Sequence, residues 1–299
     1  MLTLVLEKMP DFFWTEIERR GYSQFFKKEC DANNVQALII RTRVRGDASF
    51  INKFKNLKMI IRAGTGLDNV DIQYAESKNI IVKNTPEANT NAAYEHTIAM
   101  IFGLIKNLNA SKENVLQNKW KSGLRYNFEM GDITALIVGL GRIGSRVAKA
   151  LDFFGAKVYG VDPYIDDSVW KKLPAEKIDY DDGLKRCNLV TFHCPLTAET
   201  ENYFSLESLN IIENPIFLIN AARGSIVEEE AVIDGLKDDK LLGVGIDVFA
   251  REPWLVKDFA RDDRVIITPH SGSFTQSANN RMSFETLGVW EKLVGLPEA

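Results

Sequence analysis

Short apolar runs rich in β-branched residues recur along the chain and alternate with longer stretches in which apolar residues recur at helical spacing. Most of these runs lack an alternation with polar positions, which is typical of parallel strands that are covered on both faces. A first set of predicted strands comprises Leu2–Leu6, Ala37–Ile40, Lys58–Ile61 and Ile80–Val82. A second set comprises Ile133–Val138, Lys157–Val161, Leu189–His193, Ile216–Ile219, Val244–Ile246 and Val265–Ile267. The pattern predicts an α/β protein built on doubly wound parallel sheets.

Two helical segments flank the second set of strands. Over Asn91–Trp120 apolar residues recur at helical spacing, which predicts one long helix that joins two α/β domains. Ser277–Leu296 is also helical in pattern, and the periodicity leaves open which domain it packs on. Its residues available for packing are Met282, Leu287, Trp290 and Leu293. The length of 299 residues agrees with two domains, at about 150 residues each.

Charge and composition narrow the class of partner. The chain has 37 Lys and Arg and 41 Asp and Glu, a net charge of −4, so we expect no nucleic-acid partner. No stretch approaches the roughly 18 uncharged apolar residues of a membrane helix, so we expect no membrane partner either. The apolar run at Leu2–Leu6 is too short for a secretory signal. With three cysteines and no CxxC pair, the sequence predicts a reducing, cytoplasmic location.

A glycine-rich motif follows the predicted strand Ile133–Val138 and opens a helical pattern. In such a motif Gly139 permits a tight turn, Gly141 lets a pyrophosphate approach the backbone, and Gly144 lets the helix pack closely on the strand. The positive end of the helix then attracts the anion. The sequence therefore predicts a dinucleotide site.

The next strand ends at an acidic residue. Asp162, directly after Lys157–Val161, can accept hydrogen bonds from an adenosine ribose and repels a 2′-phosphate. We therefore expect NAD rather than NADP as the cofactor. The alternative interpretation is an ordinary strand–helix turn with an incidental aspartate, which the order of strand, glycines, helix, strand and acid disfavours.

Several chemically informative residues come directly after a predicted strand, so they share the carboxyl edge of one parallel sheet, where α/β folds bind ligands. Taken singly, each has a structural interpretation: a packed histidine, an arginine in a surface ion pair, or a solvated glutamate. Cys187, His193 and Cys194 lack the spacing of a metal site, so no metal is expected. The residues at this edge are Gly139, Asp162, Cys194, Arg223, Asp247 and His270.

A series of motifs in a fixed order resembles the D-isomer-specific 2-hydroxyacid dehydrogenase family. The motifs are Arg62-Ala63-Gly64-Thr65-Gly66-Leu67-Asp68-Asn69-Val70-Asp71, Asn84-Thr85-Pro86, the glycine motif, Asp162-Pro163-Tyr164, His193-Cys194-Pro195-Leu196-Thr197, Asn220-Ala221-Ala222-Arg223-Gly224, Asp247-Val248-Phe249 with Glu252-Pro253, and Pro269-His270. The resemblance implies a Rossmann-type NAD-binding domain at residues 93–275, inserted into a flavodoxin-like substrate domain formed by residues 1–92 and 276–299.

The resemblance also implies the roles of individual residues. Arg223, Glu252 and His270 correspond to the family's catalytic trio, with Arg223 and His270 also contacting the substrate. His270 is then the acid/base, and Glu252 fixes its tautomer. Asp247 contacts the nicotinamide carboxamide. The further cofactor contacts that the resemblance implies are Thr65, Gly139, Gly141, Arg142, Ile143, Gly144, Asp162, Cys194, Ala221, Arg223 and Ser273.

The phosphoglycerate dehydrogenase branch of the family is the most similar, which implies oxidation of 3-phosphoglycerate to 3-phosphohydroxypyruvate in serine biosynthesis. Arg41 and Arg62 match arginines near the substrate phosphate, and Arg43 and Arg45 either widen that patch or are surface charge. Glu87 and Ala88 depart from the Asn and Gly of that branch. A glyoxylate/hydroxypyruvate reductase and an NAD-sensing, corepressor-like interaction protein are the alternatives.

Two expectations concern assembly and regulation. Family members dimerise through the cofactor domain, including segments that match Asn107–Met130, so the resemblance implies at least a homodimer. The chain ends at Ala299, and we therefore expect no regulatory C-terminal domain of the kind found in longer members.

Overall fold

The computed structural model describes residues 1–27 and 30–295, and the chain divides into two compact units. Unit 1 consists of Met1–Asn91 and Ser273–Ala299, and unit 2 consists of Ala92–Gly272. The domain boundaries predicted from the sequence, after residues 92 and 275, lie within three residues of these divisions. The segment Ala92–Gly272 is thus inserted into unit 1, and each unit is described by itself.

Unit 1 is built on a parallel five-stranded sheet in the order β2-β1-β3-β4-β5, which is the flavodoxin-like order. The strands are β1 (Thr3–Val5), β2 (Phe25–Phe26), β3 (Ala37–Ile40), β4 (Met59–Arg62) and β5 (Ile81–Asn84). The helices are α1 (Asp11–Arg19), α2 (Ala48–Ile51), α3 (Ile72–Ser77) and α11 (Gln276–Val294). Strand β2 has two residues and was not predicted, because so short a strand leaves no periodic signal.

Side chains alternate between the two faces of the unit 1 sheet, and an apolar cluster covers each face. Ile39 faces one apolar cluster and Ile40 the other. Helix α11 packs on the first of these clusters, where the Trp290 indole nitrogen donates to the Thr3 hydroxyl at 2.9 Å. The packing predicted for Met282, Leu287, Trp290 and Leu293 is confirmed, and unit 1 is the unit that receives it. Leu296, the predicted last helical residue, lies outside the described residues.

Unit 2 is built on a parallel seven-stranded sheet in the order β12-β11-β10-β9-β6-β7-β8. The first six strands along the chain, β6 to β11, have the Rossmann order. Strands β7 and β8 are added on one side of β6, and the later strands are added on its other side. The strands are β6 (Thr134–Val138), β7 (Lys157–Val161), β8 (Glu176–Lys177), β9 (Leu189–Phe192), β10 (Ile216–Asn220), β11 (Leu241–Ile246) and β12 (Val265–Ile267). The predicted fold class, two doubly wound parallel sheets of the flavodoxin-like and Rossmann types, is confirmed.

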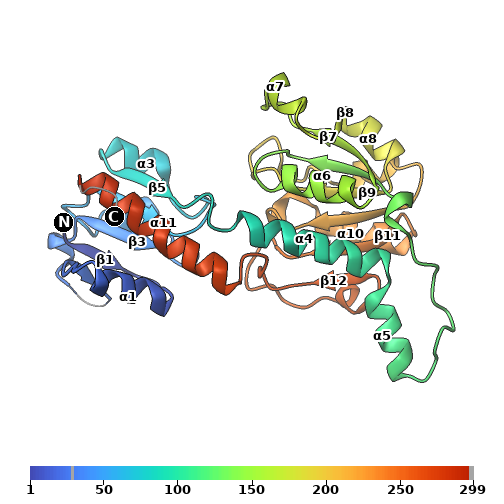
Figure 1. Cartoon of the computed structure of the whole chain (residues 1–299), viewed down its shortest axis with the longest axis horizontal. Coiled ribbons are helices and arrows are strands. Elements are labelled where there is room, and N and C mark those ends of the chain that lie inside the picture. Colours follow the sequence, from blue (N-terminus) through green and yellow to red (C-terminus); the bar gives the residue numbers. More distant parts are fainter. Residues whose placement is uncertain (28–29, 296–299) are drawn as a thin grey trace. The chain divides into compact units, whose positions relative to one another are not determined.

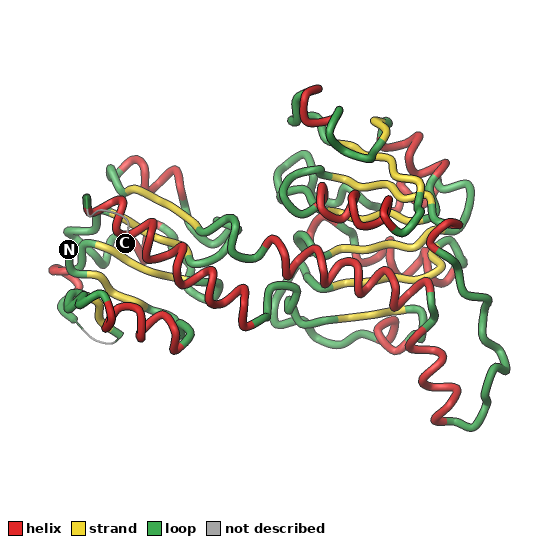
Figure 2. Tube along the Cα trace, viewed as in Figure 1, coloured by secondary structure: helices red, strands yellow, loops and turns green. Residues whose placement is uncertain are grey.

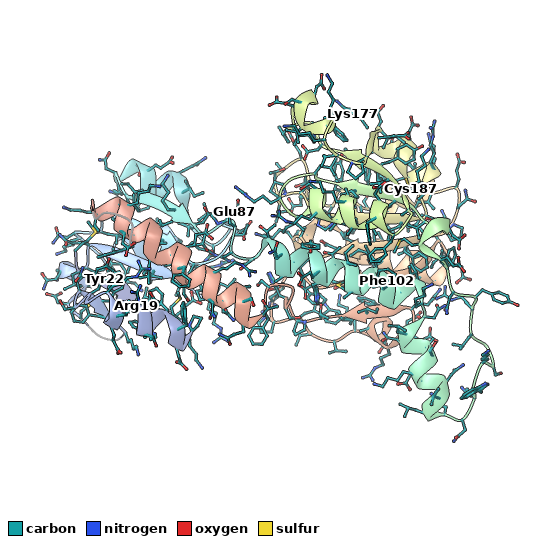
Figure 3. All side chains as sticks on the ribbon, viewed as in Figure 1. Arg19, Tyr22, Glu87, Phe102, Lys177 and Cys187 are labelled. Carbon is teal, nitrogen blue, oxygen red and sulfur yellow. The ribbon has the colours of Figure 1, made fainter. Side chains whose placement is uncertain are left out.

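Helices cover both faces of the unit 2 sheet (Figures 1 and 2). The helices of unit 2 are α4 (Thr90–Ile105), α5 (Leu108–Leu116), α6 (Gly144–Phe153), α7 (Asp167–Trp170), α8 (Tyr180–Arg186), α9 (Leu206–Ile211) and α10 (Glu229–Lys237). Helix α5 has no buried residue and extends away from the sheet (Figure 1). Ile101 of α4 and Val147 of α6 are buried in one cluster with Ile137, whereas α8, α9 and α10 pack in the other. Phe102 of α4 (Figure 3) meets the Phe154 ring edge-on, with the ring centroids 5.1 Å apart.

The prediction of a single helix over Asn91–Trp120 is wrong. Helix α4 ends at Ile105, and Asn107 adopts a left-handed conformation with φ of 48°, which asparagine tolerates better than most residues. Its side-chain amide donates to the Asn127 side chain at 2.9 Å, and the Phe128 amide caps the Ile105 carbonyl. These contacts end α4 and start α5, although the apolar spacing continues through Leu108. Among the described residues, no helix is long and apolar enough to span a membrane.

Candidate active site

The glycine motif forms a turn between β6 and α6 whose shape requires two of its glycines. Gly139 has φ of 90°, and a Cβ there would lie 2.6 Å from the Cys194 amide nitrogen. A Cβ on Gly144 would lie 1.9 Å from the Gly139 carbonyl oxygen. Gly141 differs, because a Cβ added there would meet no heavy atom within 4 Å and the Cα therefore faces open space. This is the arrangement that a bound pyrophosphate needs, at the N-terminus of a ten-residue helix.

Asp162, at the carboxyl end of β7, is held beside this turn. One carboxylate oxygen accepts from the Leu140 amide at 2.8 Å, and the other accepts from the Tyr164 amide at 2.9 Å. Each oxygen keeps a further lone pair for a ribose hydroxyl. The glycine turn and the adjacent carboxylate therefore fit a dinucleotide without a 2′-phosphate, as predicted.

The other predicted cofactor residues are distributed over both units. Arg142 is exposed in the glycine turn, and Ile143 is the residue before α6. Ala221 directly follows β10, and Cys194 packs its backbone against Gly139. Burial raises the pKa of the Cys194 thiol to about 11, so the thiol is protonated at neutral pH. Thr65 and Ser273 belong to unit 1, where the Thr65 carbonyl accepts from the Asn84 side chain and the Ser273 carbonyl accepts from the Thr275 amide at 2.9 Å.

His270 and Glu252 form a close pair within unit 2. The imidazole Nδ1 lies 2.8 Å and 3.0 Å from the two Glu252 carboxylate oxygens, and both side chains are more than a third exposed. Because Nδ1 faces the carboxylate, that nitrogen carries a proton and Nε2 is the atom that can exchange one with a ligand. This is the geometry of a histidine acid/base oriented by a carboxylate.

The loop that carries His270 is held by Asp247, directly after β11. Thr268 donates to the Asp247 carboxylate at 2.6 Å, and the amides of Ser271 and Gly272 donate to it at 2.7 Å and 2.9 Å. The His270 amide donates to the Asp247 carbonyl at 2.7 Å. Burial raises the pKa of the Asp247 carboxyl, but the hydrogen bonds from His96 of α4, from Thr268 and from the Ser271 and Gly272 amides outweigh it and leave the pKa below its usual value. The carboxylate is thus occupied by its own loop, and its contact to a carboxamide stays a prediction.

Arg223 reaches the same region from the end of β10. A Cβ on the next residue, Gly224, would lie 1.9 Å from the Phe249 carbonyl carbon, so the Arg223 loop runs directly against the loop that leads to Glu252. The Glu252 carboxylate accepts from the Phe249 amide at 3.1 Å, and the Trp254 ring stacks on the Phe249 ring at 4.6 Å. The structure therefore brings the loops of all three predicted catalytic residues to the carboxyl edge of the unit 2 sheet.

The two arginines predicted to bind a phosphate lie together in unit 1. Ile40 pairs with Arg62 across β3 and β4, so Arg41 follows at the same sheet edge. The Arg62 guanidinium lies over Gly64, where a Cβ would come within 1.8 Å of it. Arg41 donates to the Lys8 carbonyl at 3.1 Å, and burial lowers the pKa of its guanidinium. Two cationic side chains thus occupy adjacent strand ends of this sheet.

The two other histidines, His96 and His193, lie in unit 2 and are not part of the predicted catalytic trio. Burial lowers the pKa of His193 to about 3, so its ring, 3.0 Å from the Thr191 hydroxyl, is neutral. His96 places Nε2 3.0 Å from the Thr268 hydroxyl and 3.5 Å from the Asp247 carboxylate. This contact of His96 and Thr268 with Asp247 was not predicted from the sequence, although Thr268, directly after β12, carries the same positional signal as His270.

The model of the "D-isomer specific 2-hydroxyacid dehydrogenase, NAD binding domain" family matches residues 98–272, so the chain belongs to this family and its unit 2 is an NAD-binding domain. The D-3-phosphoglycerate dehydrogenases of Mycobacterium bovis and Bacillus subtilis are each 34% identical to it, over 82% and 84% of this chain and 46% and 48% of theirs. The chain spans about half the length of these relatives.

Solved structures show the same architecture over nearly the whole chain. The Aquifex aeolicus D-lactate dehydrogenase complexed with NAD and lactic acid superposes with a TM-score of 0.88 at 25% identity, covering 98% of this chain and 95% of that one. A Thermus thermophilus protein superposes with a TM-score of 0.86 at 27% identity, covering 100% of this chain and 98% of that one. These similar structures cover nearly the whole chain and therefore support both of its parallel sheets.

Proposed function

We propose that the protein is an NAD-dependent D-2-hydroxyacid dehydrogenase and that 3-phosphoglycerate is its substrate. The observation that carries the activity is the His270–Glu252 pair, held at 2.8 Å at the same sheet edge as Arg223 and the glycine turn. Residues of these types, in a domain that binds NAD, are suited to the oxidation of an alcohol next to a carboxylate.

NAD, when bound, supplies the hydride acceptor, and the chain's own residues manage the proton and the substrate. His270 takes the proton of the C2 hydroxyl on Nε2 during oxidation and returns it during reduction. Glu252 stabilises the imidazolium that forms and keeps Nδ1 protonated. Arg223 offers a planar guanidinium that binds the substrate carboxylate and polarises the C2 oxygen, for which lysine lacks the geometry.

The phosphorylated substrate is supported by Arg41 and Arg62 on adjacent strand ends and by the identity with D-3-phosphoglycerate dehydrogenases. An acid without a phosphate, such as hydroxypyruvate or glyoxylate, is the second candidate. Glu87 favours it, because this carboxylate follows β5 where the phosphoglycerate dehydrogenase branch carries an amide, and a carboxylate repels a phosphate.

Comparison of phosphohydroxypyruvate, hydroxypyruvate and glyoxylate as oxidants of NADH tests the choice of substrate. We expect the highest kcat/KM with phosphohydroxypyruvate. We also expect Arg62→Gln to raise the KM for that acid by roughly tenfold or more and to leave the KM for hydroxypyruvate within about twofold, since a charge-assisted hydrogen bond contributes roughly 1.5–3 kcal/mol. A higher kcat/KM for either unphosphorylated acid in the wild-type protein would reject phosphoglycerate as the substrate.

We propose that the enzyme is a homodimer joined through the arm at residues 107–130, which comprises α5 and the extended segment after it (Figure 2). No residue of α5 is buried, and a nine-residue helix is unstable without packing. Large apolar side chains along the arm are 56–97% exposed, and exposed apolar patches of this kind mark interfaces. These residues are Leu108, Val115, Leu116, Trp120 and Tyr126. A second copy of the chain is the partner that the family resemblance supports.

Sedimentation velocity tests this assembly. We expect the wild-type protein to be a dimer at micromolar concentration and a variant with Leu116→Lys and Trp120→Lys to be a monomer with an unchanged circular dichroism spectrum. Ile81→Lys, at a partly exposed apolar side chain of unit 1, is the control and stays dimeric. A monomeric wild-type protein, or a double variant that still dimerises, would contradict the proposal.

A further inference from the structure

A hydrogen bond joins two loops that lie on opposite sides of the glycine turn. The Tyr164 hydroxyl, two residues after Asp162, donates to the Glu199 carboxylate at 2.8 Å. Tyr164 follows β7 and Glu199 follows β9, and these strands flank β6 on its two sides. Since neighbouring strands are about 4.8 Å apart, β7 and β9 are separated by roughly 10 Å, and their loops can meet only by leaning over the carboxyl end of β6. That end carries the glycine turn.

Local hydrogen bonds fix the backbone of both loops, and one of them ties the Asp162 loop to the glycine turn. On one side Asp162 accepts from the Leu140 and Tyr164 amides, which fixes the backbone before the tyrosine ring. On the other side the Thr200 hydroxyl donates to the Pro195 carbonyl at 2.6 Å and accepts from the Thr197 amide at 2.8 Å, which closes the loop around Glu199.

The partners are suited to a bond that opens and closes. Both residues are exposed, Tyr164 by 79%, so breaking the bond requires no repacking of the core. The bond to Glu199 raises the pKa of the Tyr164 hydroxyl, which keeps it protonated as the donor at neutral pH.

We propose that Tyr164 and Glu199 form a strap across the glycine turn, which closes over the adenosine half of bound NAD and slows its release. The adenosine half is the part concerned because the strap begins two residues after Asp162, the residue that fits the ribose. The inference rests on the nucleotide site of unit 2 and concerns how long the cofactor stays bound, not the chemical step. Tyr164 and Glu199 are therefore cofactor-retaining residues rather than catalytic ones.

Dissociation of NADH, measured by stopped-flow displacement and by fluorescence titration without any acid substrate, tests the strap. We expect Tyr164→Phe and Glu199→Gln each to raise the dissociation rate of NADH about tenfold, the lower end for a hydrogen bond to a charged group, and to change its Kd less than its dissociation rate. The double variant should show no more than the effect of either single change, because both remove the same bond. The melting temperature and kcat at saturating NADH should not fall.

Two control variants distinguish loss of the Tyr164–Glu199 hydrogen bond from loss of a negative charge and from loss of a tyrosine hydroxyl. Glu201→Gln removes the same charge from the same loop, and Tyr74→Phe removes a tyrosine hydroxyl bonded to Asn52 in unit 1, so both should retain wild-type NADH dissociation. Unchanged dissociation in the two strap variants, additive effects in the double variant, or an equal effect of Glu201→Gln would overturn the strap. Loss of the dehydrogenase assignment would instead show as absent turnover in a wild-type protein that still binds NADH.

Discussion

Replacement of His270 by alanine lowers kcat by roughly 10²–10⁴-fold, the usual contribution of a positioned acid/base, and leaves the Kd of NADH within about twofold of the wild-type value. The reason is local. His270 places Nδ1 against Glu252 and leaves Nε2 to exchange a proton, while its loop is held through the backbone and through Asp247. Steady-state kinetics with phosphohydroxypyruvate and NADH, together with NADH titration, measure both quantities.

Glu252→Gln is the companion to this experiment. The amide keeps the size of the carboxylate and one acceptor oxygen but removes the charge that stabilises the imidazolium, so we expect a smaller loss of kcat than in His270→Ala. Near-normal turnover in His270→Ala would exclude this histidine as the acid/base. A loss of NADH binding in that variant would show instead that the 268–272 loop had collapsed.

A methyl group on Gly141 weakens NADH binding by about 10²-fold, close to 2.8 kcal/mol, without destabilising the protein. A Cβ at this position meets no protein atom within 4 Å, so the added methyl group occupies only the space in which a pyrophosphate approaches the backbone. NADH titration and thermal unfolding of Gly141→Ala measure the two effects separately.

Two other glycines provide the controls for Gly141→Ala. A Cβ on Gly131 would also have nothing within 4 Å, but this residue precedes β6, so Gly131→Ala should change neither NADH affinity nor stability. In Gly144→Ala the new Cβ would lie 1.9 Å from the Gly139 carbonyl oxygen, so both affinity and melting temperature should fall. Wild-type NADH affinity in Gly141→Ala would mean that the cofactor does not approach this turn.

The sequence predicted most strands and the residues that directly follow them, because both are encoded by patterns of neighbouring residues. Continuous apolar runs such as Ile133–Val138 mark buried parallel strands, and Asp162 and His270 directly follow such runs. The parallel arrangement then places the residues after each strand at one edge. The sequence could not predict β2 or β8, whose two residues each form strands only because a neighbouring strand pairs with them.

Contacts between distant residues account for what the sequence could not predict. The break at Asn107 depends on Asn127 and Phe128, about 20 residues away, and no local pattern at Leu108 reveals it. The contact of His96 with Thr268, and of Tyr164 with Glu199, likewise join segments that only the completed sheet brings together. Helical periodicity identified the apolar faces correctly but carried no information about these polar contacts.

The insertion of unit 2 into unit 1 has a consequence for how members of this family could diversify. The glycine turn, Asp162 and the three predicted catalytic residues all lie in the uninterrupted segment Ala92–Gly272, whereas Arg41 and Arg62 lie outside it. The chain crosses between the units at only two joints, after Asn91 and after Gly272. A double crossover at those joints would exchange both arginines together and leave the proposed catalytic residues unchanged. The residues proposed to bind the substrate phosphate and those proposed to transfer the proton are therefore encoded in separate segments of the chain.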